Sequence, residues 1–208
     1  MAVKEYKKLK YVIEYTHGYE EGKRYPVLLH IHGAGCRGND IKEVENHFLL
    51  RTLRRKKESR FIVVSPQCYA DTWFEIFEQL LDFTAFIREE SYTDKERFYL
   101  AGASMGGYTT WQLAMSRPEF FAAIVPVCGG GMCWNAARLK NVPIWAHHGM
   151  LDSTVKVEES IKMVNAVNSV GGNARLSIYE NVLHNSWENA YDNEEVFTWL
   201  LSHKKEQK

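Results

Sequence analysis

The feature that most constrains the fold is a repeated alternation of short apolar runs with longer segments of helical periodicity. Seven runs have the length and composition of strands, and they cover residues 11–15, 27–31, 61–65, 97–101, 122–127, 142–147 and 174–179. Five segments carry apolar residues at helical spacing, and they cover residues 41–57, 73–90, 105–116, 157–170 and 190–203. Short strands separated by amphipathic helices indicate βαβ units. We therefore predict an α/β chain with a mostly parallel, doubly wound sheet that carries helices on both faces.

The chain of 208 residues is long enough for one sizeable core, and it contains no internal repeat, low-complexity tract or linker. We expect one domain over residues 1–208. About fourteen residues separate the strand that ends at Val127 from the strand that begins at Val142. That interval is too short for a large lid, so we expect an open site.

The composition argues against several classes of partner. Lys+Arg and Asp+Glu are both 26, so the net charge is zero and nothing indicates binding to nucleic acid or to an anionic membrane. No apolar stretch approaches the ~20 residues of a membrane span, and the first residues lack a signal-peptide pattern. The four cysteines have no CxxC spacing, which favours free thiols and a cytoplasmic protein over loop disulfides in a secreted one. A homo-oligomer is compatible with these data.

The strongest motif is a glycine-flanked serine between a strand and a helix. Gly102-Ala103-Ser104-Met105-Gly106 follows the apolar residues 98–101 and opens a helical segment. In this context a G-x-S-x-G motif holds the serine in a strained turn that exposes its hydroxyl. We predict Ser104 as a nucleophile and the N–H of Met105 as an oxyanion donor, because that N–H lies at a helix N-terminus. The alternative is a glycine-rich turn without chemistry.

A serine nucleophile needs a base and an acid that orients the base. Asp152 and His184 each follow a predicted strand, and they come in the chain order Ser, Asp, His that this motif requires. We predict His184 as the base and Asp152 as its orienting acid. The adjacent His147 and His148 point to opposite faces of a strand, and no carboxylate or thiol lies at ligand spacing from them. We therefore expect no metal and no cofactor.

The glycine-rich stretch after the strand at 27–31 provides a second oxyanion donor. An acyl-transfer enzyme needs two N–H groups directed at the developing oxyanion, and glycines allow the main chain to approach the substrate closely. We favour the N–H of Ala34, with that of Gly35 second. A phosphate-binding loop is the alternative, but no Gly-Lys-Ser/Thr follows.

Taken together, these motifs resemble a known group of enzymes. The matching segments occur in order at residues 32–40, 65–73, 102–107, 148–152 and 184–187. They resemble the small lidless α/β-hydrolases, esterases and peptidases related to carbohydrate esterase family one, polyhydroxybutyrate depolymerases, dienelactone hydrolases and the prolyl-oligopeptidase catalytic domain. The resemblance implies the α/β-hydrolase fold and a Ser104–His184–Asp152 triad. It also implies an eight-stranded parent sheet, of which we expect this chain to lack the first strand.

The predicted function is hydrolysis of a small-molecule carboxylic ester through an acyl-enzyme, with a short or aromatic acyl group on a sugar or another small alcohol. Trp73 and Trp187 follow strands on the expected active-site side, where aromatic rings suit planar or hydroxylated ligands. With Gly35 and Gln67 they are the substrate-binding residues that we predict. A peptidase of prolyl-oligopeptidase type, a thioesterase or acyltransferase, and a non-catalytic binding module are the alternatives. The intact triad argues against the last.

Overall fold

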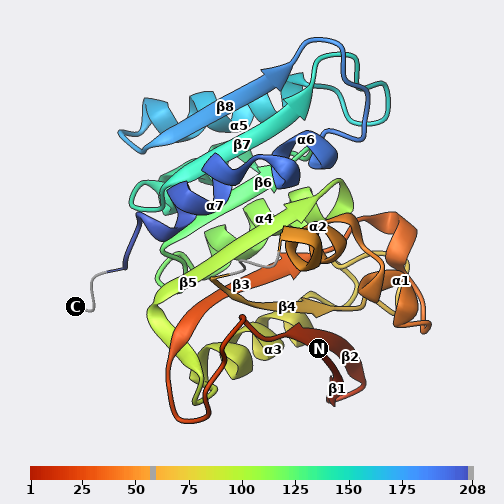
Figure 1. Ribbon diagram of the computed structural model, residues 1–208. Helices are drawn as coiled ribbons and strands as arrows, with labels where there is room; N and C mark the ends of the chain where they lie inside the picture. The colour runs from red at the N-terminus through yellow and green to blue at the C-terminus, as the bar shows by residue number, and fades with distance from the viewer. Residues whose placement is uncertain (57–59, 206–208) are drawn as a thin grey trace.

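An eight-stranded sheet forms the centre of the molecule (Figure 1). The computed structural model describes residues 1–56 and 60–205. The strands are β1 (Ala2–Tyr6), β2 (Leu9–Glu14), β3 (Tyr25–Ile31), β4 (Ile62–Pro66), β5 (Thr93–Ala103), β6 (Ala123–Val127), β7 (Ile144–Gly149) and β8 (Ala174–Tyr179). Their order is β1-β2-β4-β3-β5-β6-β7-β8; β1 and β2 pair antiparallel, as do β2 and β4, and every other pairing is parallel. The predicted mostly parallel sheet is confirmed.

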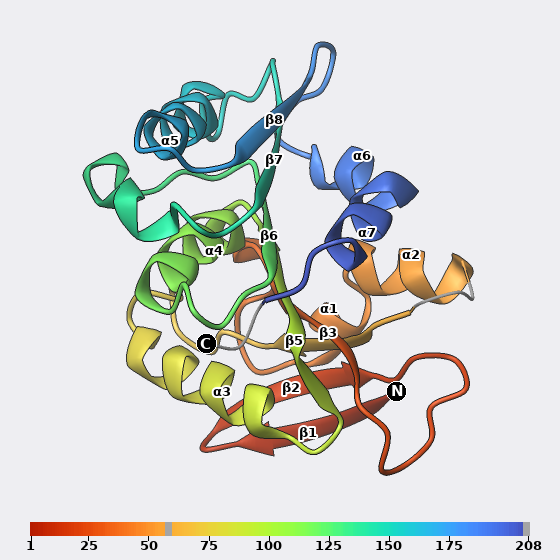
Figure 2. The ribbon, with the colours of Figure 1, turned by 90° about the vertical axis from the view of Figure 1, so that its left-hand side faces the viewer.

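Helices cover both faces of this sheet, as Figure 2 shows from the side. One face carries α1 (Lys42–Glu45), α2 (Phe48–Lys56), α6 (Trp187–Asp192) and α7 (Glu194–Leu201). The other face carries α3 (Phe77–Glu89), α4 (Met105–Ser116) and α5 (Glu158–Ser169). Two short 3₁₀ helices, η1 (Ala34–Cys36) and η2 (Cys133–Leu139), lie in loops. Because each face is covered, the central strands are apolar on both sides and appear in the sequence as unbroken apolar runs.

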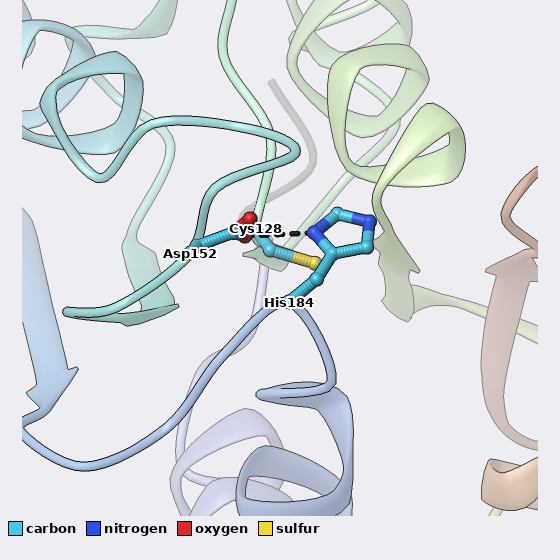
Figure 3. Close-up of side chains that lie close together, drawn as sticks. All are labelled: Cys128, Asp152 and His184. Carbon is cyan, nitrogen blue, oxygen red and sulfur yellow. Dashed lines mark hydrogen bonds and ion pairs between the residues drawn. The ribbon is translucent and has the colours of Figure 1, made fainter.

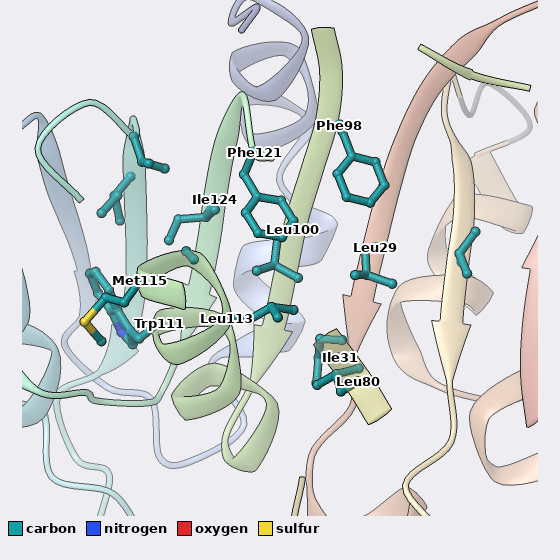
Figure 4. Packing of buried hydrophobic residues seen from close by; sticks show 14 of the residues in the cluster. Leu29, Ile31, Leu80, Phe98, Leu100, Trp111, Leu113, Met115, Phe121 and Ile124 are labelled. Atoms are coloured by element: carbon teal, nitrogen blue, oxygen red, sulfur yellow. The ribbon is translucent and has the colours of Figure 1, made fainter. Parts of the chain in front are cut away.

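Alternate residues of the central strands enter two separate cores. Leu29, Leu100 and Ile124 pack against α4, where Leu113 and Trp111 complete the layer (Figure 4). Their neighbours Leu28, Tyr99 and Val125 belong to the cluster on the opposite face, together with residues of α2, α6 and α7. The two cores fix the sheet rigidly, so the loops at its carboxyl edge start from defined positions.

The expectation that the first strand is missing is wrong. Residues 2–6 form β1, which pairs with β2 in a hairpin. Its residues are exposed or half-buried at the sheet edge, so they lack the apolar alternation that marks a strand. The turn is made by Lys7 and Lys8, both at positive φ (46° and 72°), where a hairpin usually has Asn or Gly. Neither signal was therefore present in the sequence.

Two segments predicted as single helices are each two helices. The segment at 41–57 divides into α1 and α2 around residues 46–47, and Lys57 lies outside the described residues. The segment at 190–203 divides into α6 and α7, which Asn193 separates. The helix predicted from residue 73 begins at Phe77, because residues 73–76 form a turn.

The interval between β6 and β7 holds η2 and loops, so no large lid covers the sheet edge there. Within the described parts of the chain, no helix has both the length and the hydrophobicity needed to cross a membrane. The carboxyl ends of the parallel strands β3 to β8 meet at one edge of the sheet, where ligand sites form in folds of this type.

Candidate active site

Ser104 lies in a sharp turn between β5 and α4. Its backbone has φ 57° and ψ −120°, a conformation that is strained for a residue with a Cβ. A Cβ on Gly102 would come within 2.4 Å of the Gly106 carbonyl oxygen, and a Cβ on Gly106 within 2.0 Å of the Ile31 carbonyl oxygen. Both positions therefore require glycine. The Ser104 N–H donates to the carbonyl of Val127 at 2.9 Å, which ties the turn to β6.

The structure brings Ser104, His184 and Asp152 together in one hydrogen-bonded chain. Ser104 Oγ lies 2.8 Å from His184 Nε2, and His184 Nδ1 lies 2.7 Å from Asp152 Oδ2. Figure 3 shows the imidazole directed at the carboxylate. A carboxylate can only accept a hydrogen bond, so Nδ1 carries the proton and Nε2 is left to accept the serine hydroxyl proton. This arrangement is able to remove a proton from Ser104.

The Asp152 carboxylate is held ionised. Its side chain is buried, and burial acts to raise its pKa, but the hydrogen bonds from His184 and from the N–H groups of Val155 and Thr154 outweigh burial and lower the pKa below its ordinary value. Those two N–H groups both donate to Oδ1 at 2.9 Å. The loop after β7 therefore provides the contacts that keep the orienting charge in place.

A second serine–histidine contact lies behind Asp152. His148 Nδ1 is 2.7 Å from Ser160 Oγ, and His148 Nε2 is 2.9 Å from the Val155 carbonyl and 3.3 Å from Asp152 Oδ2. Both His148 and Ser160 are buried, and the Ser160 hydroxyl donates to the carbonyl of Gly129. A substrate cannot reach this serine, so the group supports Asp152 rather than forming a second nucleophilic site.

Two main-chain N–H groups lie beside Ser104. Met105 is the first residue of α4 and Ala34 the first of η1, so neither N–H has an acceptor within its own helix. A Cβ on Gly33 would be 3.2 Å from the Ala103 carbonyl oxygen and 3.4 Å from the Ser104 Cβ, which brings the loop against the nucleophile. The arrangement can accept an oxyanion at the helix end.

The loop that carries Ala34 is fixed by side chains from elsewhere. Arg37 donates to the carbonyl of Ala34 at 2.9 Å and to that of Asp71 at 2.8 Å. Gln67 Nε2 donates to the carbonyls of Cys36 at 3.0 Å and Asp40 at 2.7 Å. Gln67 is thus a structural residue of this loop.

Ser104 and His184 open into a cavity of about 560 Å³, here called the Ser104 pocket. Gly35 and Trp187, two predicted substrate-binding residues, line it. The Trp187 ring meets the His184 ring edge-on, with centroids 5.4 Å apart. The lining of the Ser104 pocket comes from the loop after β3, from α1, α2 and α6 and from residues near Ser104. It comprises Gly33, Ala34, Gly35, Cys36, Glu43, Asn46, His47, Phe48, Arg51, Ala103, Ser104, Thr154, His184, Trp187 and Glu188.

The predicted substrate-binding role is wrong for two residues, Trp73 and Gln67. Trp73 is fully buried in the core, where its ring packs on His32 and its Nε1–H donates to the His32 carbonyl at 3.0 Å. Gln67 is also buried, and its side-chain amide is hydrogen-bonded to the loop that carries Ala34. Both follow β4 and so lie on the expected side of the sheet, but their side chains turn inward. Position after a strand does not determine which way a side chain points.

Sequence reasoning missed pocket residues on the helices that follow β3, such as Glu43 on α1 and Phe48 and Arg51 on α2. These belong to amphipathic helices whose solvent-side residues carry no motif. It also missed Cys128, which contacts the site at positive φ (39°) directly after β6.

Cys128, Asp152 and His184 hold their potential ligand atoms within 4.8 Å of one another. Burial raises the pKa of the Cys128 thiol to about 12. The Nδ1 and Oδ2 atoms already bond to each other.

The known proteins to which this chain is similar are esterases and peptidases. Residues 68–131 match the sequence model of the prolyl oligopeptidase family. A probable feruloyl esterase C of Aspergillus terreus is 22% identical over 163 residues, which cover 75% of this chain and 59% of that protein. A thermostable esterase of known structure has a TM-score of 0.82 and 31% identity over 94% of this chain and 59% of its own. An acylaminoacyl peptidase from Pyrococcus horikoshii has a TM-score of 0.72 and 16% identity, over 96% of this chain and 40% of its own.

The chain thus spans 59% of the length of both esterases. The sheet order, the glycine-flanked serine turn and these similarities show that the chain has the α/β-hydrolase fold, as the sequence motifs indicated.

Proposed function

We propose that this protein is a serine hydrolase that cleaves small-molecule carboxylic esters through an acyl-enzyme intermediate. The observation that carries the proposal is the unbroken hydrogen-bonded chain from Ser104 Oγ through His184 to Asp152, at the wall of an open pocket. Ser104, His184 and Asp152 are its catalytic residues, and Ala34 and Met105 are its oxyanion donors.

The reaction follows from the positions of the protons. His184 Nε2 takes the Ser104 proton as Oγ attacks the ester carbonyl carbon, and the N–H groups of Ala34 and Met105 stabilise the oxyanion. When the carbon–oxygen bond to the alcohol breaks, His184 Nε2–H gives its proton to the leaving alkoxide. Water then repeats the sequence on the acyl-enzyme and releases the acid. Asp152 stays ionised throughout and stabilises the imidazolium.

The acyl group that we favour is short or aromatic, with a sugar or another small alcohol as leaving group. Trp187 at the rim of the Ser104 pocket suits a planar or hydroxylated ligand, and no large lid lies between β6 and β7 to form a long lipid trough. The similarity to a probable feruloyl esterase supports the same class.

A peptidase is the second candidate, because residues 68–131 match the prolyl oligopeptidase family and an acylaminoacyl peptidase has the same fold. A panel of p-nitrophenyl esters, acyl-thioesters and peptide amides separates these activities. We expect the highest kcat/KM on esters. A preference for amides would favour the peptidase.

The test of the nucleophile is covalent labelling by a fluorophosphonate. We expect labelling and ester hydrolysis in the wild type, and neither in Ser104→Ala, whose turnover should fall by about 10⁴- to 10⁶-fold. Ser160→Ala is the matched control, because Ser160 also contacts a histidine but is buried, and it should still be labelled. Labelling that persists in Ser104→Ala would refute the assignment.

A reducing, cytoplasmic setting fits this proposal. All four cysteines are free thiols, at positions 36, 68, 128 and 133.

A further inference from the structure

A second and larger cavity is lined by residues of the segment that leads into α3, of α4 and of the loop after β6. Helices α3 and α4 lie on the face of the sheet opposite α2 and α6 (Figure 2). We call this cavity the α3–α4 groove, and its volume is about 890 Å³. Its lining is rich in aromatic and aliphatic side chains and comprises Tyr69, Phe74, Glu75, Ile76, Phe77, Glu78, Gln79, Tyr108, Gln112, Gly130, Gly131 and Met132.

Three of these side chains are large, apolar and exposed. Phe74 is 51% exposed, Tyr69 39% and Met132 37%. Phe74 also stacks on Phe77, with ring centroids 6.2 Å apart. Exposed apolar surface that gathers in one concave site favours an apolar ligand, because the ligand removes that surface from water.

Two segments that line the groove are joined by main-chain hydrogen bonds to segments of the active site. Tyr108 lies one helical turn from Ser104 on α4, and its N–H donates to the Ser104 carbonyl at 3.0 Å. The segment around Tyr69, residues 68–71, is hydrogen-bonded to the loop that carries Ala34. The Gly38 N–H donates to the Cys68 carbonyl at 2.8 Å, and the Arg37 side chain donates to the Asp71 carbonyl. One wall of the groove therefore starts from the helix that follows Ser104, and another from the segment that holds the Ala34 loop.

The proton transfer decides which half of the ester enters which cavity. His184 Nε2 must deliver its proton to the oxygen of the leaving alcohol, so that alcohol has to lie on the His184 side of Ser104. His184 lines the Ser104 pocket, with Trp187 beside it. The acyl half then lies on the side of Ser104 away from His184.

We propose that the α3–α4 groove is the acyl subsite and selects an aryl or arylalkyl acyl group, whereas the Ser104 pocket takes the alcohol. The polar side chains of that pocket, Glu43, Asn46 and Arg51 among them, suit a hydroxylated alcohol. The proposal rests on the ester hydrolysis proposed above. It assigns Phe74 and Met132 as specificity-determining residues that take no part in the chemistry.

Two isomeric esters test this assignment, because they differ only in the side of the ester that carries the phenyl ring. Methyl 3-phenylpropanoate has the ring on the acyl side, and 2-phenylethyl acetate has it on the alcohol side. We expect Phe74→Ala to lower kcat/KM for methyl 3-phenylpropanoate by about tenfold or more, and to leave 2-phenylethyl acetate within about twofold of wild type. Met132→Ala should act in the same direction.

Val3→Ala is the matched control, since Val3 is similarly exposed (46%) but lies on the edge strand β1. It should leave both substrates unchanged. Equal losses on the two isomers, or a loss confined to 2-phenylethyl acetate, would overturn the acyl subsite while leaving ester hydrolysis intact. If the wild type hydrolyses neither of the two isomers nor methyl acetate, the proposed function itself is refuted, and the subsite with it.

Discussion

Two glycines near Ser104 differ in what surrounds them. A Cβ on Gly106 would lie 2.0 Å from the Ile31 carbonyl oxygen, whereas a Cβ on Gly35 would meet nothing within 4 Å. Gly106→Ala should therefore force α4 away from β3 and lower the free energy of unfolding by about 2 kcal/mol or more, because backbone atoms cannot move aside as a side chain can. Gly35→Ala should change it by less than about 0.5 kcal/mol. Urea denaturation of the two variants measures both values, and similar losses would contradict the geometry.

His148 is a positioning residue for Asp152. It contacts the Val155 carbonyl, Asp152 and Ser160 but lies away from the Ser104 pocket. We expect His148→Ala to lower kcat by up to about a hundredfold with little change in KM, because the Asp152 loop shifts while the pocket remains.

His148→Gln should recover part of this loss, since its amide can donate where Nε2 does. The kcat values are normalised to the fraction of Ser104 that reacts with fluorophosphonate, which removes any unfolded protein from the comparison. A loss that appears only in KM, or no loss at all, would argue against a positioning role.

At the scale of elements, the covered strands and the helix after Ser104 were predicted from the sequence, whereas the edge strand β1 and the two helix breaks were missed. Helix α4 has the predicted bounds, because a strained serine turn begins it and Pro118 follows its end. β1 was missed because one edge strand needs few apolar residues and its turn uses Lys7 and Lys8. Apolar periodicity also continues across a helix break when both helices pack on the same core, as α6 and α7 do.

The break between α6 and α7 does have a local signal, an Asn followed by two acidic residues. The Asn193 side chain accepts the Glu195 N–H at 3.0 Å and caps α7. Asn193→Ala should lower the free energy of unfolding by about 1 kcal/mol, because it leaves a helix N–H without its acceptor. Asn189→Ala, at an exposed position inside α6, should be neutral or slightly stabilising. Thermal unfolding of this matched pair checks the cap, and equal effects would contradict it.

For the whole molecule, the residues that the sequence could assign are those whose chemistry requires a fixed order and spacing along the chain. Ser104, Asp152 and His184 follow three parallel strands and meet at one edge, so a topology prediction was sufficient to bring them together. Pocket walls depend on side-chain direction, which topology does not give. Trp73 and Gln67 turn inward, and Phe48 and Arg51 approach from a helix that has no motif.

Buried neutral histidines should make the whole fold sensitive to mild acid. Burial lowers the pKa of His32 and His47 to about 4 and that of His147 to about 3, and it holds the pKa of His30 well below its ordinary value. In the unfolded chain each histidine binds a proton near pH 6.5. Between about pH 6.5 and 4 the unfolded state therefore binds more protons, and stability falls as the pH falls.

Each such histidine should contribute up to about 1.4 kcal/mol per pH unit to this slope. We expect the free energy of unfolding, measured by urea denaturation, to be constant near neutral pH and to decline steadily below about pH 6.5. Asp152, whose pKa is lowered, adds its own loss only below its unfolded value, near pH 4. His147→Asn should reduce the slope by up to about 1.4 kcal/mol per pH unit, the contribution of one proton, because Asn does not titrate. Asn can also keep the contact that His147 Nδ1 makes with the Tyr179 hydroxyl. Equal slopes in the wild type and in His147→Asn would contradict this origin of acid sensitivity.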